Sequence, residues 1–209
     1  MKYLFLVFFL ISTATLAQRD SLHGVYSLEG VQETASVFQL NPDSTFEFFY
    51  SYGALDRYGK GKWRLEQNEV VLTGEPYPGK DFKMVGSSMA PVKGMVLRLK
   101  DKNPVFNNFF YARVKTTKGD TIIKADRTGT IRLPKVVSTI DLLFELTPEK
   151  ISPFTLPKST HNQFTFAFEP WIAEVFFSRF RLQMNNGDLQ GKHPLLTGER
   201  YRYGKIHNQ

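Results

Sequence analysis

The chain has 209 residues, a formal net charge of +7 and no cysteine. Without cysteine there is no disulfide framework, thiolate zinc site, iron–sulfur cluster or catalytic thiol. Hydrophobic residues make up 42% of the chain and charged residues 22%, an ordinary globular composition that excludes wholesale disorder. Aromatic residues reach 14%, which favours a protein rich in β-strands.

The first segment has the pattern of a secretory signal peptide. Lys2 gives a positive start, residues 3–11 are an unbroken apolar run, and Thr15 and Ala17 are small residues before a plausible cut. The run is too short to cross a bilayer as a helix, which needs about 20 residues. The pattern predicts a signal peptide over residues 1–17 and a periplasmic or secreted mature chain without a transmembrane span. A buried N-terminal strand is the alternative.

The charge is uneven along the chain. Residues 18–91 hold 7 Lys/Arg against 10 Asp/Glu, whereas residues 92–209 hold 19 against 10. A basic half suits an anionic surface or polymer. The basic residues nevertheless sit at alternate positions of expected strands, which indicates solvated sheet faces, and no nucleic acid partner is expected. Examples are Arg113/Lys115, Arg179/Arg181 and Arg200/Arg202.

From residue 24 to residue 73 the pattern predicts an antiparallel meander. The turn at residues 41–44 has Pro at its second position and Asp at its third, and the aromatic residues that follow alternate with period two. Trp63 and Leu65 are likewise two apart, so we expect Trp63 to be buried beneath a barrel.

The segment FQLNPDSTFEFFYSYGALDRYGKGKWRLEQNEVVLTG resembles the meander of small lipocalin-like bacterial barrels. The shared features are an Asp-containing turn, an aromatic strand, a Gly-x-Trp step, and a strand that starts with an acid or Asn. The resemblance covers residues 24–74 and extends to a broader set of uncharacterised secreted bacterial proteins. It implies a barrel fold and little about function.

Residues 75–93 are rich in Pro and Gly and predict a linker, after which strand patterns resume. The segment VKTTKGDTIIKADRTGTIRLP resembles the carboxypeptidase-regulatory-like, or transthyretin-like, β-sandwich. The segment KDKNPVFNNF stands where that family has a small, Pro/Gly-rich opening. The resemblance implies a domain that is not a peptidase.

A second linker is expected over residues 150–160, followed by strands to the end of the chain. The fold class is therefore all-β, an antiparallel barrel-like module with an inserted or following small β-sandwich. We expect residues 22–90 and 160–206 to form the lipocalin-like module, since closing the two sets of strands on each other removes their open edges. Residues 94–150 would form the inserted sandwich. Two modules in series are the alternative.

Catalytic patterns are absent from the sequence. The four histidines, His23, His161, His193 and His207, lack the spacing of metal ligands and are expected at the surface. There is no G-x-S-x-G motif, and the Gly59–Lys62 run lacks Walker spacing. No catalytic residue, metal or cofactor is expected.

One segment departs from ordinary hairpin chemistry. Residues 50–59 read as a ten-residue connection, longer than a plain turn needs. Its tyrosines offer stacking faces and its Arg a planar fork, so the candidate ligand-binding residues are Tyr50, Tyr52, Asp56, Arg57 and Tyr58. The alternative is that Asp56 and Arg57 stabilise the loop while the tyrosines cover the barrel end.

Two functions are compatible with these patterns. The first is an exported, non-enzymatic cell-envelope protein that binds a small ligand, a glycan or an envelope protein. The second is a secreted hydrolase that uses dispersed acids such as Asp56 and Glu169. The all-β modules, the abundant aromatic residues and the missing catalytic motifs favour the first.

Overall fold

The computed structural model describes residues 22–53, 55–116, 119–157 and 160–207. The described residues form strands β1 to β16 and one short 3-10 helix, η1 (Pro104–Phe109), so the expected all-β class is confirmed. They divide into two units. The barrel unit contains the residues up to Pro76 and from Glu174 onward, and the inserted unit is Tyr77–Ala173. The expected signal peptide, residues 1–17, lies outside the described residues.

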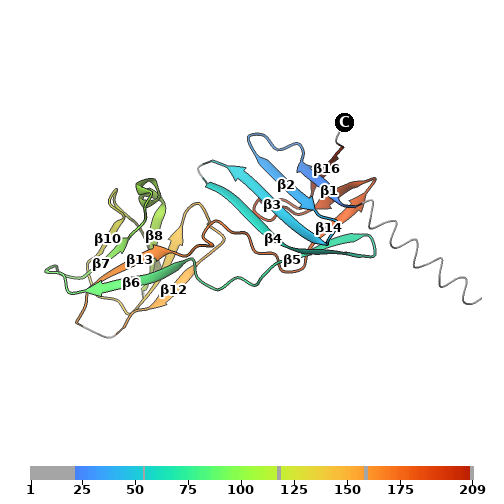
Figure 1. Ribbon diagram of the computed structural model, residues 1–209. Coiled ribbons are helices and arrows are strands. Elements are labelled where there is room, and N and C mark those ends of the chain that lie inside the picture. Colours follow the sequence, from blue (N-terminus) through green and yellow to red (C-terminus); the bar gives the residue numbers. More distant parts are fainter. Residues whose placement is uncertain (1–21, 54, 117–118, 158–159, 208–209) are drawn as a thin grey trace, which may run out of the picture. The chain divides into compact units, whose positions relative to one another are not determined.

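The barrel unit is a closed antiparallel barrel (Figure 1). Its order is β1-β16-β15-β14-β5-β4-β3-β2. Pairing of β5 with β14 and of β1 with β16 joins the two distant parts of the chain and leaves no open edge. The strands are β1 Gly24–Leu28, β2 Ala35–Leu40, β3 Thr45–Tyr52, β4 Leu55–Glu66, β5 Glu69–Thr73, β14 Phe180–Asn185, β15 Asp188–Gly191 and β16 Tyr201–Ile206.

The first tight turn shows how local sequence sets the meander. The Asp43 carboxylate accepts hydrogen bonds from the Thr45 amide, at 2.9 Å, and from the Thr45 hydroxyl, at 2.6 Å. Ser44 lies in the left-handed region with φ of 70°. Short polar side chains stabilise such a turn by bonding to the backbone two residues on. In the strand that follows this turn, Phe46 and Phe48 face inward and are nearly unexposed.

The barrel interior is filled by side chains. Phe38 packs on Phe48 with ring centroids 4.8 Å apart and on Tyr203 at 5.1 Å. Phe177, which precedes β14, packs against Phe46 and Phe48. Trp63 is 2% exposed and its indole N–H donates to the Asn41 carbonyl at 2.9 Å, which confirms the expected burial.

The glycines of the Gly59–Lys62 run have a packing role. A Cβ on Gly59 would lie 2.6 Å from the Phe177 ring, and a Cβ on Gly61 would lie 2.2 Å from the Thr73 carbonyl oxygen. These contacts are too close for any side chain, so both positions need glycine. Lys60 and Lys62 alternate with them and face solvent, although Gly59 itself is buried.

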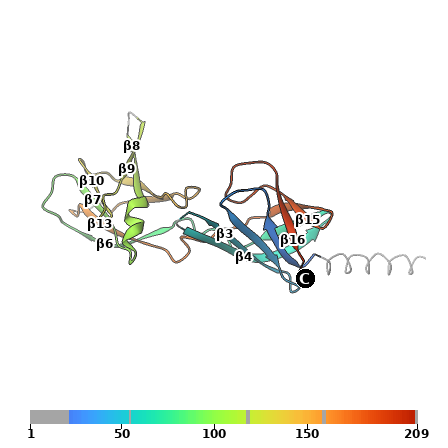
Figure 2. The ribbon, with the colours of Figure 1, turned by 90° about the horizontal axis from the view of Figure 1, so that it is seen from above.

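The inserted unit contains two four-stranded sheets, seen from above in Figure 2. Their orders are β10-β7-β13-β6 and β12-β11-β8-β9, and β13 runs parallel to β7. The strands of the first sheet are β6 Phe82–Ser88, β7 Met95–Leu99, β10 Thr130–Leu133 and β13 Gln163–Phe168. Those of the second are β8 Phe110–Thr116, β9 Gly119–Lys124, β11 Thr139–Phe144 and β12 Ser152–Thr155.

Aromatic contacts hold these two sheets face to face as a sandwich. Phe82 and Phe110 have ring centroids 5.6 Å apart, and Phe154 and Phe166 are separated by 4.9 Å. Phe144 and Phe168 approach to 4.7 Å. Each pair joins one sheet to the other, so the unit has its own core.

The boundaries expected for the insertion were too narrow. Residues 82–88 and 163–168 were assigned to the barrel module, whereas β6 and β13 pair with each other in the inserted unit. β13 also pairs with β7. The inward faces of β6 and β13 carry Phe82, Phe164 and Phe166, all nearly unexposed. Strand pairing, together with burial of these aromatic side chains, therefore places both β6 and β13 in the sandwich.

Candidate functional site

The expected ten-residue connection at residues 50–59 is instead the tip of a hairpin. β3 and β4 pair without interruption from Thr45↔Lys62 to Tyr52↔Leu55. The chain reverses through Gly53, which has φ of 74° in the left-handed region. The prediction of a loop here is wrong, because the strands of the hairpin continue as far as Tyr52 and Leu55.

Strand alternation separates the five candidate residues. Tyr50 and Arg57 are opposite each other in the register, and both are buried, at 7% and 3% exposure. Asp56 and Tyr58 occupy the positions between them and are exposed on the other face. Because adjacent strand residues point to opposite faces, Asp56 and Arg57 do not share a site. Tyr52 lies next to the tip and is 59% exposed.

A buried histidine lies beside the inward half of this hairpin. His193 is 5% exposed, with its ring 5.1 Å from that of Tyr50 and 6.2 Å from that of Tyr203. Its Nδ1 accepts hydrogen bonds from the amides of Leu195, at 2.9 Å, and Leu196, at 3.0 Å. The surface position expected for this histidine is therefore wrong.

The hydrogen bonds of His193 define its chemical state. Nδ1 accepts two amide protons, so the ring proton lies on Nε2, which donates to the Ser36 hydroxyl at 3.0 Å. Burial lowers the pKa of His193 to about 4, because the charged ring would lose its hydration. The ring is therefore neutral at physiological pH and anchors the turn after it. It is buried with both nitrogens engaged, which suits a structural role.

The outward half of the hairpin presents an aromatic pair. Phe49 and Tyr58 lie directly opposite each other and are 42% and 48% exposed. Ser51 and Asp56 form the next outward pair towards the tip. We call Phe49, Ser51, Asp56 and Tyr58 the outer hairpin face. It combines two ring surfaces with a hydroxyl and a carboxylate at the next cross-strand position.

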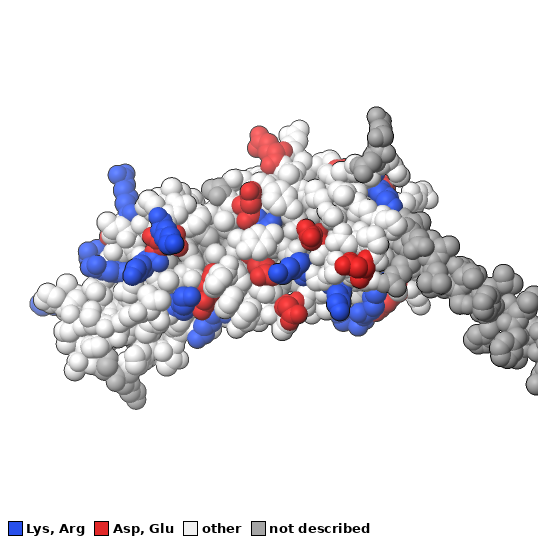
Figure 3. Space-filling view, in the orientation of Figure 1, with Lys and Arg blue, Asp and Glu red and all other residues white. Residues whose placement is uncertain are grey.

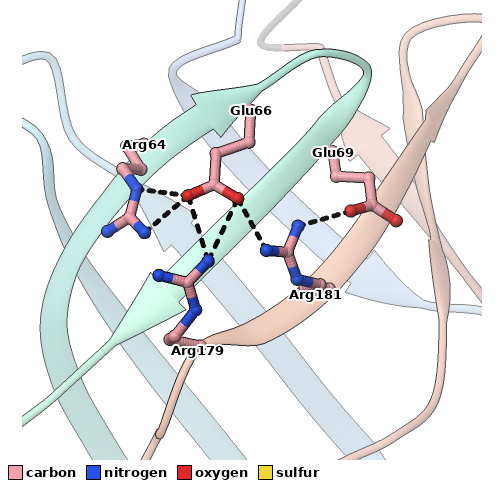
Figure 4. Close-up of polar contacts among 5 residues, drawn as sticks. All are labelled: Arg64, Glu66, Glu69, Arg179 and Arg181. Atoms are coloured by element: carbon pink, nitrogen blue, oxygen red, sulfur yellow. Dashed lines mark hydrogen bonds and ion pairs between the residues drawn. The ribbon is translucent and has the colours of Figure 1, made fainter.

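Elsewhere on the barrel, charged side chains bind each other (Figure 4). The Glu66 carboxylate accepts from Arg64 at 2.8 Å and from Arg181 at 2.6 Å, and Arg181 also reaches Glu69 at 2.6 Å. Arg179 completes the group at 3.4 Å from Glu66. The hydrogen bond from Arg64, followed by that from Arg181, lowers the pKa of Glu66. This ladder joins β4, β5 and β14, as expected for charges on a solvated sheet face.

The two acids considered for hydrolysis, Asp56 and Glu169, lie in different units. Asp56 belongs to the barrel unit and Glu169 to the inserted unit. Glu169 forms an ion pair with Lys83 at 3.2 Å. Nearby, the Trp171 indole donates to the Lys80 carbonyl at 2.9 Å, which ties the segment after β13 to the start of β6.

The inserted unit contains a buried ion pair that no local sequence pattern predicts. Lys150 Nζ lies 3.4 Å from the Asp81 carboxylate and donates to the carbonyls of Trp171, at 3.3 Å, and Ile172, at 3.0 Å. The Asp81 amide donates to the Ser152 hydroxyl at 2.7 Å. Burial raises the pKa of Asp81, and the Lys150 charge opposes that rise. The pair fixes the ends of several segments and has a structural role.

Within the described ranges, no group of three or more His, Asp or Glu side chains is placed to hold a metal ion. No helix in the described part of the chain is long and apolar enough to cross a membrane. Comparison of the chain with family models, curated proteins and solved structures found no match.

Proposed function

We propose that the chain is an exported, non-enzymatic protein of the cell envelope that binds a glycan on its outer hairpin face. The observation that carries this proposal is the exposed cross-strand pair Phe49 and Tyr58 beside Ser51 and Asp56. Exposed aromatic rings that adjoin polar groups are typical of interaction sites. Sugar C–H groups pack on ring faces, while sugar hydroxyls donate to a carboxylate.

The filled barrel interior supports an external site over an internal one. Phe38, Phe48, Phe177 and Tyr203 occupy the space in which a wider barrel would hold a small apolar ligand. The two candidate residues that face inward, Tyr50 and Arg57, are part of this packing. Outward side chains on the same hairpin are the ones that a large ligand can reach.

We also propose that the two units are related to lipocalin-like barrels and transthyretin-like sandwiches. A closed barrel and a two-sheet sandwich support it at the level of architecture. Export rests on the signal-peptide pattern of residues 1–17. Sequencing the N-terminus of the soluble protein should give Gln18, and a retained Met1 would contradict export.

The glycan proposal is tested by titrating the purified chain with soluble neutral β-glucan, α-glucan and xylan by calorimetry. Tyr58→Ala should weaken the binding of at least one of them by about 30-fold, since truncating an aromatic anchor costs about 2 kcal/mol. Ile122→Ala is the matched control, because Ile122 is an apolar side chain 62% exposed in the inserted unit. It should leave affinity unchanged.

Two results would contradict this function. The first is the absence of glycan binding, or equal weakening by Tyr58→Ala and Ile122→Ala. The second is hydrolysis of a glycan. If the unchanged chain releases new reducing ends and Asp56→Asn does not, the chain is a hydrolase. Thermal unfolding of each variant shows whether it is folded.

A further inference from the structure

The inserted unit carries a hollow on the outward face of its first sheet. It has a volume of about 810 Å³. Along β7, Leu97 and Leu99 face the core, so Arg98 between them faces outward. The register places Thr130 of β10 and Thr165 of β13 on either side of Arg98. A long cationic side chain thus stands between two short hydroxyl side chains.

Basic side chains dominate the rim of this hollow. Lys100, Lys102 and Arg132 line it together with Arg98, against the single lining acid Asp101. Arg132 is held by Asp126, with 3.0 Å between Nη1 and Oδ2. Within the described residues, no carboxylate forms an ion pair with Arg98, Lys100 or Lys102. Figure 3 shows Lys and Arg side chains gathered over the inserted unit.

Most of the uncharged lining residues carry a hydroxyl or an amide group. Thr165 and Gln163 of β13 lie beside the cations, and Gln163 donates to the Ser88 hydroxyl at 3.2 Å. The next position across the sheet from Thr165 is Gly86, where an added Cβ would meet no atom within 4 Å. The floor is therefore shallow and open, with room for a bulky polar ligand.

We propose that this hollow binds an anionic polysaccharide, whose sulfate or carboxylate groups pair with Arg98 and Lys100. Its sugar hydroxyls bind Thr165 and Gln163. Arg presents a planar fork that matches the geometry of such anions, and hydrogen bonds to charged groups are the stronger ones. The site lies in the inserted unit, so it goes beyond the neutral-glycan site proposed on the barrel and is independent of it.

The lining favours a polysaccharide over other polyanions. Among the described lining residues there is no aromatic ring, whereas single-stranded nucleic acids are bound by stacking of bases on such rings. A membrane surface is bound by apolar side chains that insert beside the cations. Here the neutral partners of the cations are mainly hydroxyl and amide groups in a hollow, which suits a hydroxyl-rich chain.

The test is calorimetric titration of the purified chain with dextran sulfate, polygalacturonate and uncharged dextran. At least one acidic polymer should bind, uncharged dextran should bind far more weakly, and affinity should fall as salt rises from about 0.05 M to about 0.5 M. The two acidic polymers distinguish a sulfate from a carboxylate ligand. Binding of neither acidic polymer, or equal binding of uncharged dextran, would overturn the proposal.

Three variants separate the hollow from general positive charge. Arg98→Gln should weaken binding about tenfold, the loss expected for one charge-assisted hydrogen bond. Thr165→Tyr keeps every charge but fills the floor, and should weaken binding to a similar degree. Lys115→Gln removes one charge from β8, in the other sheet, and should change affinity less than twofold.

Two further outcomes would refute this assignment. In the first, Arg98→Gln and Lys115→Gln weaken acidic-polymer binding equally and Thr165→Tyr has no effect. That result would mean that the polymers are attracted by the positive charge of the whole surface and not by the hollow. The other is tighter binding to vesicles of anionic phospholipid or to single-stranded DNA than to both acidic polymers. Melting curves of the variants show that the inserted unit is folded. Tyr58→Ala should bind the acidic polymers as tightly as the unchanged chain does. The test of the hollow therefore remains valid even if no neutral glycan binds to the barrel.

Discussion

Acid should destabilise the barrel through His193. In the folded barrel its Nδ1 accepts two backbone amides and burial lowers its pKa to about 4. An unfolded chain has a histidine pKa of ~6.5. Because the unfolded state takes up the proton more readily, this group's contribution to stability is fully present above about pH 6.5 and is lost as the pH falls through 4.

The size of the effect follows from the two pKa values. A fall from ~6.5 to about 4 corresponds to roughly 3 kcal/mol, at ~1.36 kcal/mol for each pKa unit. Most of this contribution has been lost by pH 4.5. Burial raises the pKa of Tyr50 and of Tyr203, whose rings pack against His193, so both stay neutral over this range.

The assay compares the chain with His193→Asn, whose side-chain oxygen can still accept from the Leu195 and Leu196 amides. Urea unfolding is followed at pH 7.5 and 4.5 by Trp63 fluorescence, in a Trp171→Phe background that leaves one indole, inside the barrel. The stability advantage of His193 over the variant should shrink by roughly 2–3 kcal/mol on acidification. Parallel losses in the two proteins would refute the assignment of a buried neutral histidine.

Three other perturbations test the packing, each by urea unfolding. Trp63→Ala should cost ~3–5 kcal/mol, the usual range for a buried indole, and a loss below ~1 kcal/mol would place Trp63 at the surface. Arg57→Ala should lower the free energy of unfolding by more than ~2 kcal/mol, because Arg57 is buried. Asp56→Ala, at the exposed neighbouring position, should change it by less than ~0.5 kcal/mol, and similar losses in the two variants would contradict the assigned faces. Lys150→Ala should cost ~3–5 kcal/mol, with partial recovery in the double variant with Asp81→Asn, since the second change removes the stranded charge. Additive losses would argue against that pair.

The sequence alone determined the all-β class and much of the meander. Period-two alternation is a local property, so it identified the inward positions of β3 and the burial of Trp63 in the second half of β4. The turn at Asp43 was recognisable for the same reason, because its side chain bonds to the backbone two residues on. These features need no knowledge of distant partners.

The candidate site was only partly predictable. Tyr50, Tyr52 and Tyr58 are among the candidates that the sequence predicts, but it also predicts a ten-residue connection over residues 50–59. Continuous pairing to Tyr52↔Leu55 shows strands there. Once strands are recognised, alternation itself separates Tyr58 from Arg57 and brings Phe49 into the outer hairpin face. The choice between a loop and a strand rests on cross-strand hydrogen bonds, which composition does not report.

Tertiary structure alone decided which distant strands pair and what becomes buried. Residues 75–93 read as a linker, and the alternation of residues 163–168 suits either unit. Only the pairing of β13 with β6 and β7, together with aromatic packing, places both strands in the sandwich. His193 became a core residue because β2 supplies Ser36 and β3 supplies Tyr50 around it. Lys150 met Asp81 from 69 residues away in the chain. Such contacts join segments remote in sequence, so no local periodicity encodes them, and the free energy of burial selects them only when the sheets close.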